Sequence, residues 1–549
     1  MSAYSQVQVP QVAMHAFDNS YDVKTTADMM QCIPVMCDEI NPGEVVKISH
    51  ETVIRFQPLL APILHEVNVF LNYYFVPYRI LWDKWEEFIT RVEGEDTPVC
   101  PRFSDGKDYI PVTFGETSSI STLIGSLWDY FGFQTDVLLT EYNKPVPFPW
   151  LAYNMIWNEN LRDENLQDEV PNGPLNPDVS RFGGSLHKIN NTVLYRAWKK
   201  DYFTSALPFQ QRGEAPALPI SGFTSAVFDD IPNQSVMGAQ QNDGVSAGVQ
   251  EMYYYSTDGS SAALKGVQNG SLYTDGKQNL LVDGDDLGYD LNRHNTVDFA
   301  NALGSDINDL RLAIALQHRG ELSARGGQRY VEFLQSNYGA FPRDDRLQRP
   351  EYIGGTVNPV IISEVQQQSD STQQNTPTGT LYGKATSVGV NKVGSYRAKE
   401  FGLIMGILTV SPKPVYQTGI DRQWSRFTPQ DYFNPLFNGL SEQAILNKEI
   451  YSDGSENDEK IWGYTGMYNE LRYKNSKVTG LMRSDFDYWH LSRQFSSLPE
   501  LNGQFVSGSD VRKDIFSVPS EPGLIINHRN NVKIIRAIPR IPTPGINKI

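Results

Sequence analysis

Residues 66–89 read EVNVFLNYYFVPYRILWDKWEEFI, and this stretch decides the class of fold. Its first half carries an apolar or aromatic residue at every second position from Val67 to Phe75. A period of two places these side chains on one face of a β-strand. The opposite face is apolar in part, at Phe70, Tyr74 and Val76. The pattern predicts a strand covered on both faces, either inside a sandwich or under a neighbouring chain.

The period changes after Pro77, which cannot donate a hydrogen bond to a sheet. Residues 81–92 then show the spacing of an amphipathic helix. Its apolar side carries Trp82, Trp85, Phe88, Ile89 and Val92. Its polar side carries Asp83, Lys84, Glu86 and Glu87. The stretch therefore predicts a buried strand that leads into a helix.

Strand-like runs recur along the whole chain. They lie at 33–35, 44–56 and 401–410, and more weakly near 413–417, 481–488 and 532–538. Helical spacing occurs at 151–161 and from about Ser305, where the expected apolar side is Ile307, Leu310 and Ile314. Many strands separated by long insertions indicate a mainly β protein, a viral-type jelly roll or sandwich with loop and helical insertions.

Composition sets further limits. The chain has 549 residues, 40 % of them hydrophobic, and a formal net charge of −17. An acidic total argues against a protein that coats nucleic acid over its whole surface, although a local basic face is still allowed. The three cysteines, Cys32, Cys37 and Cys100, are too few for a disulfide framework and are expected to be reduced. Because the chain has no run of about 18 apolar residues and no signal-peptide pattern, we expect neither membrane insertion nor secretion.

Residues 224–304 differ from the sequence on either side. They are rich in Gly, Ser, Asn and Asp, and they hold 11 acidic residues against three basic ones, a net charge of −8. Short apolar islands at 252–255, 262–264 and 280–282 predict a small ordered protrusion instead of a plain linker. We therefore divide the chain into a first core part with an N-terminal arm (1–223), an acidic surface insertion (224–304) and a second core part with a basic tail (305–549).

No convergent polar site for enzymatic chemistry is visible in the sequence. The eight histidines are scattered, and none pairs at the spacing of zinc ligands. The acidic run DGDD at 283–286 lacks the rest of a calcium loop and is expected to be solvated. We expect no catalytic residue, no metal and no cofactor, and hence no enzyme.

Two basic stretches, 181–212 and 523–549, stand out against the acidic background. Lysine and arginine that face phosphates release counterions whatever the base sequence. Aromatic rings beside them offer surfaces on which unpaired bases stack. The predicted contacts with single-stranded DNA are Arg196, Trp198, Lys199, Lys200, Arg536 and Arg540. Salt bridges to acidic residues of a neighbouring subunit are an equally open interpretation of the basic residues.

Five stretches in order resemble the major capsid protein of the Microviridae, small icosahedral phages with single-stranded DNA, and most closely its gokushovirus branch. Besides residues 66–89 they are KTTADMMQCIPVMCDEINPG (24–43), WLAYNMIWNENLRDENLQ (150–167), DYFTSALPFQQRG (201–213), and INDLRLAIALQ, ARGGQRYVEFL and RLQRPEYIGG within 307–355. The resemblance runs to about residue 365 and is looser in the C-terminal third.

The resemblance implies a structural function. It implies a jelly roll of roughly eight strands that forms a T=1 shell around circular single-stranded DNA, assembled in the host bacterial cytoplasm. It implies other copies of the chain, an internal scaffolding protein, a small basic DNA-packaging protein and a DNA pilot protein as partners. In the gokushovirus branch a large insertion forms protrusions at the threefold axes, and residues 224–304 occupy its place, where they are expected to contact a host surface receptor.

The aromatic density around residues 70–85 exceeds the needs of one core and, with the resemblance, predicts a subunit interface, since aromatic residues are enriched at interfaces. The predicted interface residues are Phe70, Tyr73, Tyr74, Trp82 and Trp85. The alternative function is a carbohydrate-binding protein or an enzyme, because jelly rolls also occur in lectins and cupins.

Overall fold

A computed structural model of the chain describes residues 13–90, 98, 100–101, 112–113, 124–135, 145–170, 187–213, 307–326, 348–366, 368, 380–417, 419–439 and 442–541, and six short strands between 236 and 286. The chain divides into two units, residues 1–212 with 321–549, and residues 213–320. The acidic segment 224–304 lies within the second unit.

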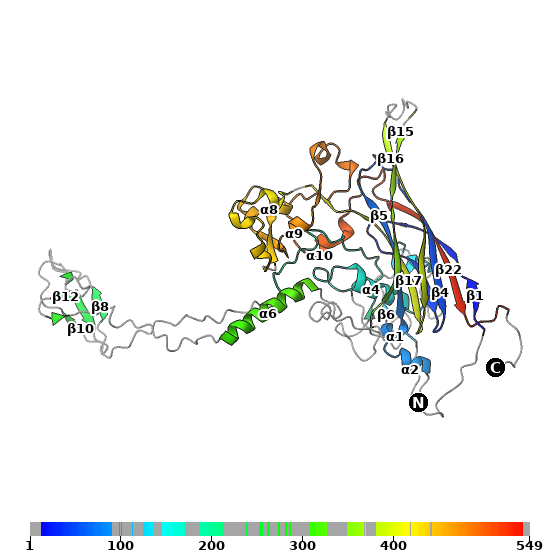
Figure 1. The fold of residues 1–549 in the computed structure, drawn as a ribbon, viewed down its shortest axis with the longest axis horizontal. Coiled ribbons are helices and arrows are strands. Elements are labelled where there is room, and N and C mark those ends of the chain that lie inside the picture. Colours follow the sequence, from blue (N-terminus) through cyan, green and yellow to red (C-terminus); the bar gives the residue numbers. More distant parts are fainter. Residues whose placement is uncertain are drawn as a thin grey trace. The chain divides into compact units, whose positions relative to one another are not determined.

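The first unit is built on two antiparallel sheets (Figure 1). The four-stranded sheet has the order β14 (Glu351–Pro359), β5 (Val67–Pro77), β17 (Gly402–Pro412) and β3 (Ile33–Ile40). The six-stranded sheet has the order β22 (Leu524–Arg536), β4 (Val45–Phe56), β16 (Leu381–Arg397) and β15 (Ile361–Gln366). Its remaining strands, β1 (His15–Asp18) and β2 (Tyr21–Ala27), both pair with the other edge of β22.

The chain passes repeatedly from one sheet to the other. β2, β4, β16 and β22 belong to the six-stranded sheet, and β3, β5, β14 and β17 belong to the four-stranded sheet. The first and last strands are neighbours, with His15 of β1 opposite Arg536 of β22. Two packed antiparallel sheets with these crossings form a jelly roll. The prediction of a mainly β, jelly-roll fold is confirmed.

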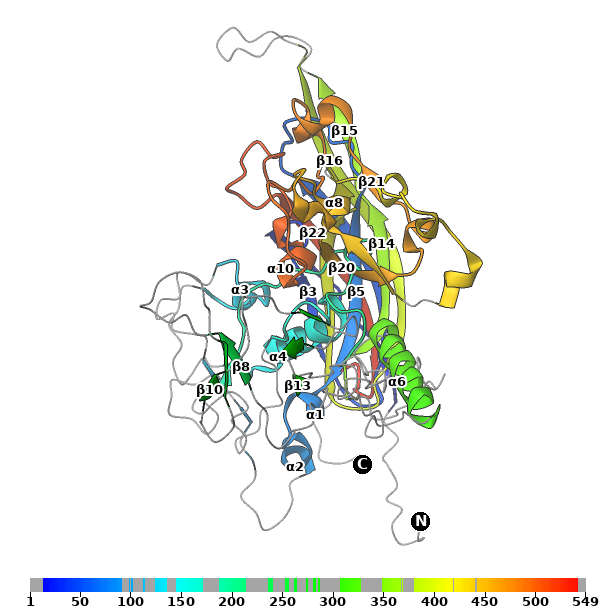
Figure 2. The same ribbon diagram turned by 90° about the vertical axis from the view of Figure 1, so that its left-hand side faces the viewer.

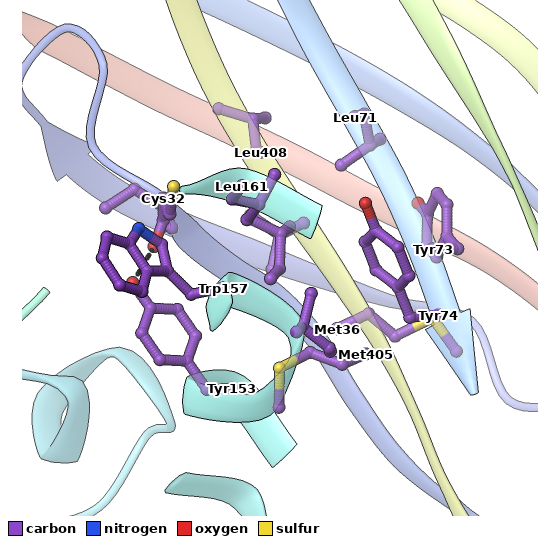
Figure 3. Close-up of a cluster of buried hydrophobic side chains, with 14 of the residues drawn as sticks. Cys32, Met36, Leu71, Tyr73, Tyr74, Tyr153, Trp157, Leu161, Met405 and Leu408 are labelled. Atoms are coloured by element: carbon purple, nitrogen blue, oxygen red, sulfur yellow. Dashed lines mark hydrogen bonds between the residues drawn. The ribbon is translucent and has the colours of Figure 1, made fainter. Parts of the chain in front are cut away.

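β5 is covered on both faces. Tyr73 points into the space between the sheets and is 0 % exposed, with its hydroxyl 3.5 Å from Asn530 Oδ1 on β22. On the other side of the four-stranded sheet lies α4 (Phe148–Ile156), continued by a π-helical turn (Trp157–Leu161). Figure 3 shows Tyr153 of α4 against this sheet, where its hydroxyl donates to the Cys32 carbonyl oxygen at 2.8 Å. The covering layer therefore includes a helix of the same chain.

The helix predicted over 81–92 is interrupted. α1 (Tyr78–Leu81) and α2 (Trp85–Thr90) are separate, and residues 91 and 92 lie outside the described residues. Between them Trp82 is extended, with φ of −144°, and only 1 % exposed. Its ring packs 6.5 Å from that of Phe148 on α4. Burial of this large ring outweighs the few hydrogen bonds that a continuous helix would add.

The prediction of a strand at 481–488 is also wrong, because this stretch lies in two 3₁₀ helices (Gly480–Arg483 and Asp487–Trp489). Gly480 has a φ of +67°, a left-handed conformation that a β-strand does not contain. The predicted strand at 413–417 is reduced to the two residues of β18 (Val415–Tyr416). The predicted strand at 532–538 is the end of the longer β22.

Long insertions join the strands of the jelly roll. Between β5 and β14 lie β6 (Val112–Thr113), α3 (Leu127–Tyr130), α4, β7 (His187–Lys188) and α6 (Ile307–Gly326). α6 begins close to the predicted start, and Ile314 of its apolar side is 59 % exposed. Between β17 and β22 lie β18, β19 (Glu442–Leu446), α8 (Asn447–Ile450), β20 (Ile461–Gly466), α9 (Asn469–Arg472), β21 (Ser476–Lys477) and α10 (Gly503–Val506) (Figure 2). This second insertion, residues 413–523, packs together with Tyr202 and Phe203 in an apolar cluster that includes Ile445, Trp462 and Phe505.

The second unit contains two small antiparallel sheets. One consists of β8 (Val236–Ala239), β9 (Met252–Tyr255) and β10 (Ser261–Ala263). The other consists of β11 (Tyr273–Thr274), β12 (Leu280–Val282) and β13 (Asp285–Asp286). The apolar islands at 252–255, 262–264 and 280–282 coincide with three of these strands. The acidic segment therefore has strand structure of its own.

Candidate nucleic-acid and subunit interfaces

The first basic stretch is built into the body of the first unit. The main-chain N–H of Arg196 donates to the Met30 carbonyl oxygen at 2.8 Å. The N–H of Trp198 donates to the Val506 carbonyl oxygen at 2.9 Å. These bonds join the jelly roll to the insertion at 413–523. Most side chains of this stretch consequently have partners inside the chain.

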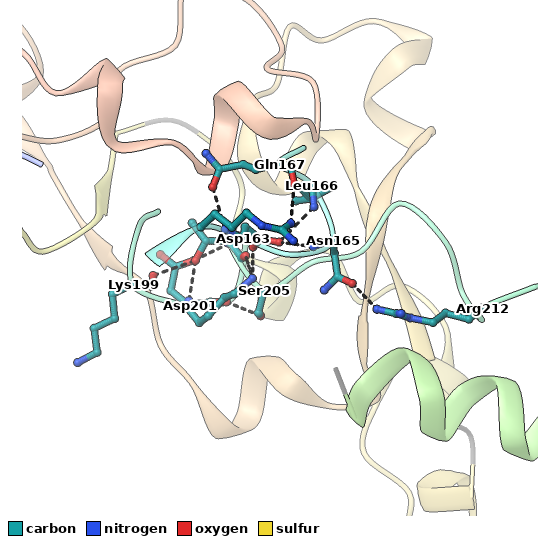
Figure 4. A network of polar contacts seen from close by, with 11 residues as sticks. Asp163, Asn165, Leu166, Gln167, Lys199, Asp201, Ser205 and Arg212 are labelled. Carbon is teal, nitrogen blue, oxygen red and sulfur yellow. Dashed lines mark hydrogen bonds and ion pairs between the residues drawn. The ribbon is translucent and has the colours of Figure 1, made fainter. Parts of the chain in front are cut away.

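Asp201 is the centre of a buried polar network (Figure 4). Its Oδ1 accepts from the N–H groups of Phe203 and Thr204 at 2.9 and 2.8 Å, and from the Thr204 hydroxyl at 3.0 Å. Its Oδ2 accepts from the Tyr416 hydroxyl at 2.7 Å. Burial and this carboxylate raise the pKa of Tyr416 well above its ordinary value. Four donors satisfy the carboxylate, as a buried charge requires.

The two lysines next to this network differ in their surroundings. The Lys200 ammonium pairs with the carboxylate of Asp163, whose side chain is 1 % exposed. Asp163 also accepts from the N–H of Asn165 at 2.9 Å. Lys199 is exposed, and its side chain points away from the network (Figure 4). Of the two predicted phosphate contacts, Lys199 is thus the one without a carboxylate partner among the described residues.

Trp198 is 3 % exposed, and its indole N–H donates to Asp510 Oδ1 at 2.9 Å. A ring buried in this way cannot stack on a base, so the prediction of a stacking role for Trp198 is wrong for this conformation. The Arg196 guanidinium lies 4.7 Å from the centre of the half-buried Phe70 ring. It thereby covers an apolar ring with its own planar group.

The C-terminal candidates also separate into two kinds. Arg536 at the end of β22 pairs with the buried Glu44, with Nε 3.0 Å from Oε1. Arg540 is exposed and has no ion pair among the described residues. Of the six predicted DNA contacts, Lys199 and Arg540 are therefore the exposed basic residues without a carboxylate partner.

The predicted interface aromatics lie mostly inside the chain. Tyr73, Tyr74 and Trp82 are 0 %, 4 % and 1 % exposed. A neighbouring subunit cannot contact these side chains without opening the core, so their assignment to a subunit interface is wrong. Trp85 is half-buried and packs edge-on against Tyr78, with ring centres 4.8 Å apart. The aromatic density of this stretch is used within the chain because α4 adds a layer that the sequence pattern does not reveal.

A basic surface is present instead on the six-stranded sheet. Along β4 and β22 buried and less buried residues alternate, which places one face in the core and one face outside. The outside face carries eight exposed basic residues, called here the basic face: Lys24, Lys47, Arg55, Lys384, Lys392, Arg397, Arg529 and Lys533. The acidic residues exposed beside them on the described strands are Asp18, Asp22 and Glu51. Eight bases against three acids amount to +5, in a chain of net charge −17.

The charges of the basic face are poorly compensated within the chain. Lys47 of β4 lies directly opposite Lys533 of β22. Like charges in this position destabilise a sheet. Within the described residues only Arg529 of the eight has an ion pair, with Asp22 at 3.9 Å. An anion from outside the chain would therefore stabilise this surface. Strand-like runs at 44–56 and 532–538 were visible in the sequence, but the gathering of bases from four strands was not.

The insertion at 413–523 contains a cavity of about 350 Å³. Three carboxylates line it, and all three are held by internal partners. Asp421 pairs with Lys474 at 2.9 Å. Glu449 accepts from the Tyr202 hydroxyl at 2.8 Å and pairs with Arg422 at 3.0 Å, while burial raises its pKa. Glu470 pairs with Arg426 at 2.9 Å. None of the three carboxylates has the free position that a general base needs.

Other chemical groups add no site. Three or more His, Cys, Asp or Glu side chains do not gather anywhere in the described part of the chain. Cys32 is a buried thiol, and burial raises its pKa to about 12, which makes it unreactive. Of the helices that the structure describes, none combines the length and apolarity needed to cross a bilayer.

Residues 5–546 match the family described as capsid protein (F protein). The chain belongs to this phage capsid protein family. The capsid protein VP1 of Chlamydia phage 1 is 34 % identical to it, over 100 % of this chain and 98 % of the relative. VP1 of Bdellovibrio phage phiMH2K is 34 % identical over 95 % and 94 %, and VP1 of Spiroplasma virus 4 is 28 % identical over 99 % and 96 %.

These relatives extend the family assignment over the C-terminal third, where the sequence motifs were weaker. They confirm the resemblance to the Microviridae and its gokushovirus branch. The capsid protein is therefore a structural protein of the virion and not an enzyme. Its jelly roll is the scaffold of a shell subunit that assembles with copies of itself.

Proposed function

We propose that the capsid protein forms a T=1 shell around a circular single-stranded DNA genome, with its basic face turned toward the DNA. The family supports the shell. The separation of charge supports the orientation. Residues 224–304 carry −8, whereas the basic face carries +5. Phosphates are attracted by the basic face and repelled by residues 224–304.

The proposal includes the partners that the resemblance implies: an internal scaffolding protein, a small basic DNA-packaging protein and a DNA pilot protein, with assembly in the host cytoplasm. The charge of the chain supports the packaging protein in particular. A chain of −17 with one basic surface neutralises few phosphates. A separate basic protein would supply the remaining positive charge.

The basic face is tested by the salt dependence of binding to a fluorescently labelled, random-sequence pool of single-stranded oligonucleotides. Each phosphate contact on a single strand contributes about 0.7 to the slope of log K against log salt concentration. Replacing Lys47, Lys392 and Lys533 with alanine should therefore reduce the slope by roughly two and weaken binding equally for all sequences. Fluorescence anisotropy of the labelled oligonucleotides, titrated with the purified chain at several salt concentrations, measures both quantities.

The matched control replaces Lys460, Lys474 and Lys477, three exposed lysines of the insertion at 413–523, with alanine. It removes the same charge from a different surface and should leave the slope within about half a unit of the parent value. The pair Lys199→Ala and Lys200→Ala should reduce the slope by less than one, since Lys200 is paired with Asp163. Equal losses in the basic-face and control variants would contradict the proposed orientation.

We also propose that residues 224–304 form an outward protrusion used in attachment to a host receptor. Replacing them with a short Gly-Ser linker should leave a folded, β-rich protein, because the segment lies in a separate unit with its own strands. Circular dichroism and thermal unfolding check the fold, and particle yield and infectivity check the function. Intact particles that no longer infect would support attachment. A collapsed fold would show that the segment belongs to the core.

A further inference from the structure

Six large apolar side chains are exposed within residues 420–436, called here the aromatic segment. The exposed fractions are 41 % for Ile420, 70 % for Trp424, 81 % for Phe427, 57 % for Tyr432, 53 % for Phe433 and 85 % for Leu436. Isolated exposed apolar residues are common on proteins, but six in one short segment are not. Trp, Tyr and Phe are also the residues enriched where proteins contact each other. Figure 2 shows this stretch, in yellow, within the insertion and clear of both sheets.

The aromatic segment is held in place by its own polar groups. Asp431 Oδ2 accepts from the N–H groups of Phe427 and Thr428 at 3.0 and 2.8 Å and from the Thr428 hydroxyl at 2.9 Å. Asn434 Oδ1 accepts from the N–H of Leu436 at 3.0 Å. These bonds shape short 3₁₀ helices at Pro429–Asp431 and Pro435–Gly439. The apolar side chains are therefore presented by an ordered backbone, which lowers the entropy lost when a partner binds.

The charges of the aromatic segment are already compensated. Arg422 pairs with Glu449 at 3.0 Å and Arg426 with Glu470 at 2.9 Å. Asp421 pairs with Lys474 at 2.9 Å. The Asp431 carboxylate accepts hydrogen bonds from the backbone N–H groups of Phe427 and Thr428, and these bonds lower its pKa. An apolar surface without spare charge fits an apolar protein surface and not a phosphate backbone.

The size of the surface also fits a subunit contact. The six side chains together expose roughly 700 Å², given that a large side chain presents some 150–250 Å² when fully accessible. A stable protein–protein interface takes about 800 Å² from each partner. The aromatics that the sequence suggested for this purpose, such as Tyr73 and Trp82, are buried in the chain itself.

We propose that the aromatic segment is a contact between neighbouring copies of this capsid protein, an inference that rests on the proposed shell. A capsid subunit must cover apolar surface against several copies of itself, and this is a large, ordered and uncharged apolar surface available for it. The partner is accordingly a second copy of the chain. An internal scaffolding protein or a host molecule on this surface is an outcome that the experiment distinguishes.

The first test replaces Phe427 and Leu436 with glutamate in the full chain, co-expressed with the other structural proteins of the phage. Both side chains are more than 80 % exposed, so the variant should fold, which its circular dichroism and melting temperature verify. Particle yield on a sucrose gradient should fall at least tenfold. The matched control, Phe427→Leu with Leu436→Met, keeps the surface apolar and should assemble like the parent.

A glutamate variant that assembles within twofold of the parent would overturn the inference. If the parent chain itself forms no particles under these conditions, the proposed shell fails, which is a different result. The second test identifies the partner. With Phe427→Cys in purified particles, a short bis-maleimide should join the segment to another copy of this chain, as mass spectrometry of the linked peptides shows. A link to a different polypeptide, or free reaction with a bulky maleimide in intact particles, would also overturn the inference.

Discussion

Replacing Arg493 with alanine should lower the free energy of unfolding of the first unit by about 3–5 kcal/mol. The Arg493 side chain is 4 % exposed. Its Nη2 donates to Asp510 Oδ2 at 2.9 Å and to the Phe505 carbonyl oxygen at 2.6 Å. The guanidinium also lies 4.2 Å from the centre of the Phe505 ring and 5.3 Å from that of Trp198. Alanine removes the partner of a carboxylate and leaves a space among aromatic rings.

Unfolding in urea, monitored by tryptophan fluorescence, measures this loss. Near-ultraviolet circular dichroism identifies the transition in which the first unit unfolds. Arg493→Lys should show an intermediate loss, because lysine keeps the charge but not the planar fork that binds both acceptors. Lys474→Ala is the control. It breaks a pair in which the lysine side chain is 58 % exposed and should cost less than about 1 kcal/mol. A similar small loss for Arg493→Ala would mean that the stack around Trp198 does not depend on the arginine.

Acidification should destabilise the jelly roll through two buried histidines. His50 and His528 are 1 % and 0 % exposed, and they lie in a chain of polar contacts between the sheets. Thr52 Oγ1 lies 3.1 Å from His50 Nδ1 and 2.8 Å from His528 Nδ1. His50 Nε2 lies 2.8 Å from Thr356 Oγ1, and His528 Nε2 lies 2.9 Å from Asn530 Oδ1. Neutral imidazole rings satisfy these contacts.

Burial lowers the pKa of both His50 and His528 from 6.5 to about 4. The unfolded chain therefore takes up two protons below pH 6.5 that the folded chain does not accept until about pH 4. The contribution of the two histidines to stability is therefore fully present above pH 6.5. It decreases as the pH falls from the pKa of the unfolded chain to that of the folded chain, and it is lost below the folded-state pKa. The loss should reach roughly 3 kcal/mol for each ring.

The measurement is the free energy of unfolding at several pH values between 7 and 4, compared with the double variant His50→Gln and His528→Gln. Glutamine keeps hydrogen-bonding groups but does not titrate, so the variant should show a shallower decrease with falling pH. His65 remains in both proteins, and since burial also lowers its pKa to about 4, some dependence should persist. His15→Gln, a half-buried residue of β1, serves as the control. An unchanged slope in the double variant would assign the acid sensitivity to other groups.

The amino-acid sequence was sufficient for the main strands and for the family. The runs at 33–35, 44–56 and 401–410 coincide with β3, β4 and β17, because a strand buried on one or both faces needs apolar side chains at adjacent or alternating positions. The compositional change at 224–304 marked a segment that lies in a separate unit. The helix at 81–92 was predicted too long, since a local period does not show that Trp82 turns inward to meet Phe148.

The use of individual charged and aromatic residues was decided by tertiary structure alone. Lys200 and Arg536 meet the buried carboxylates of Asp163 and Glu44, which are 37 and 492 positions away in the chain. Trp198 is covered by residues near 493–510. The basic face gathers bases from β2, β4, β16 and β22 only because these strands are neighbours in one sheet. Periodicity describes how a side chain is oriented on its own strand or helix, whereas charge compensation and burial depend on which distant segment packs against it.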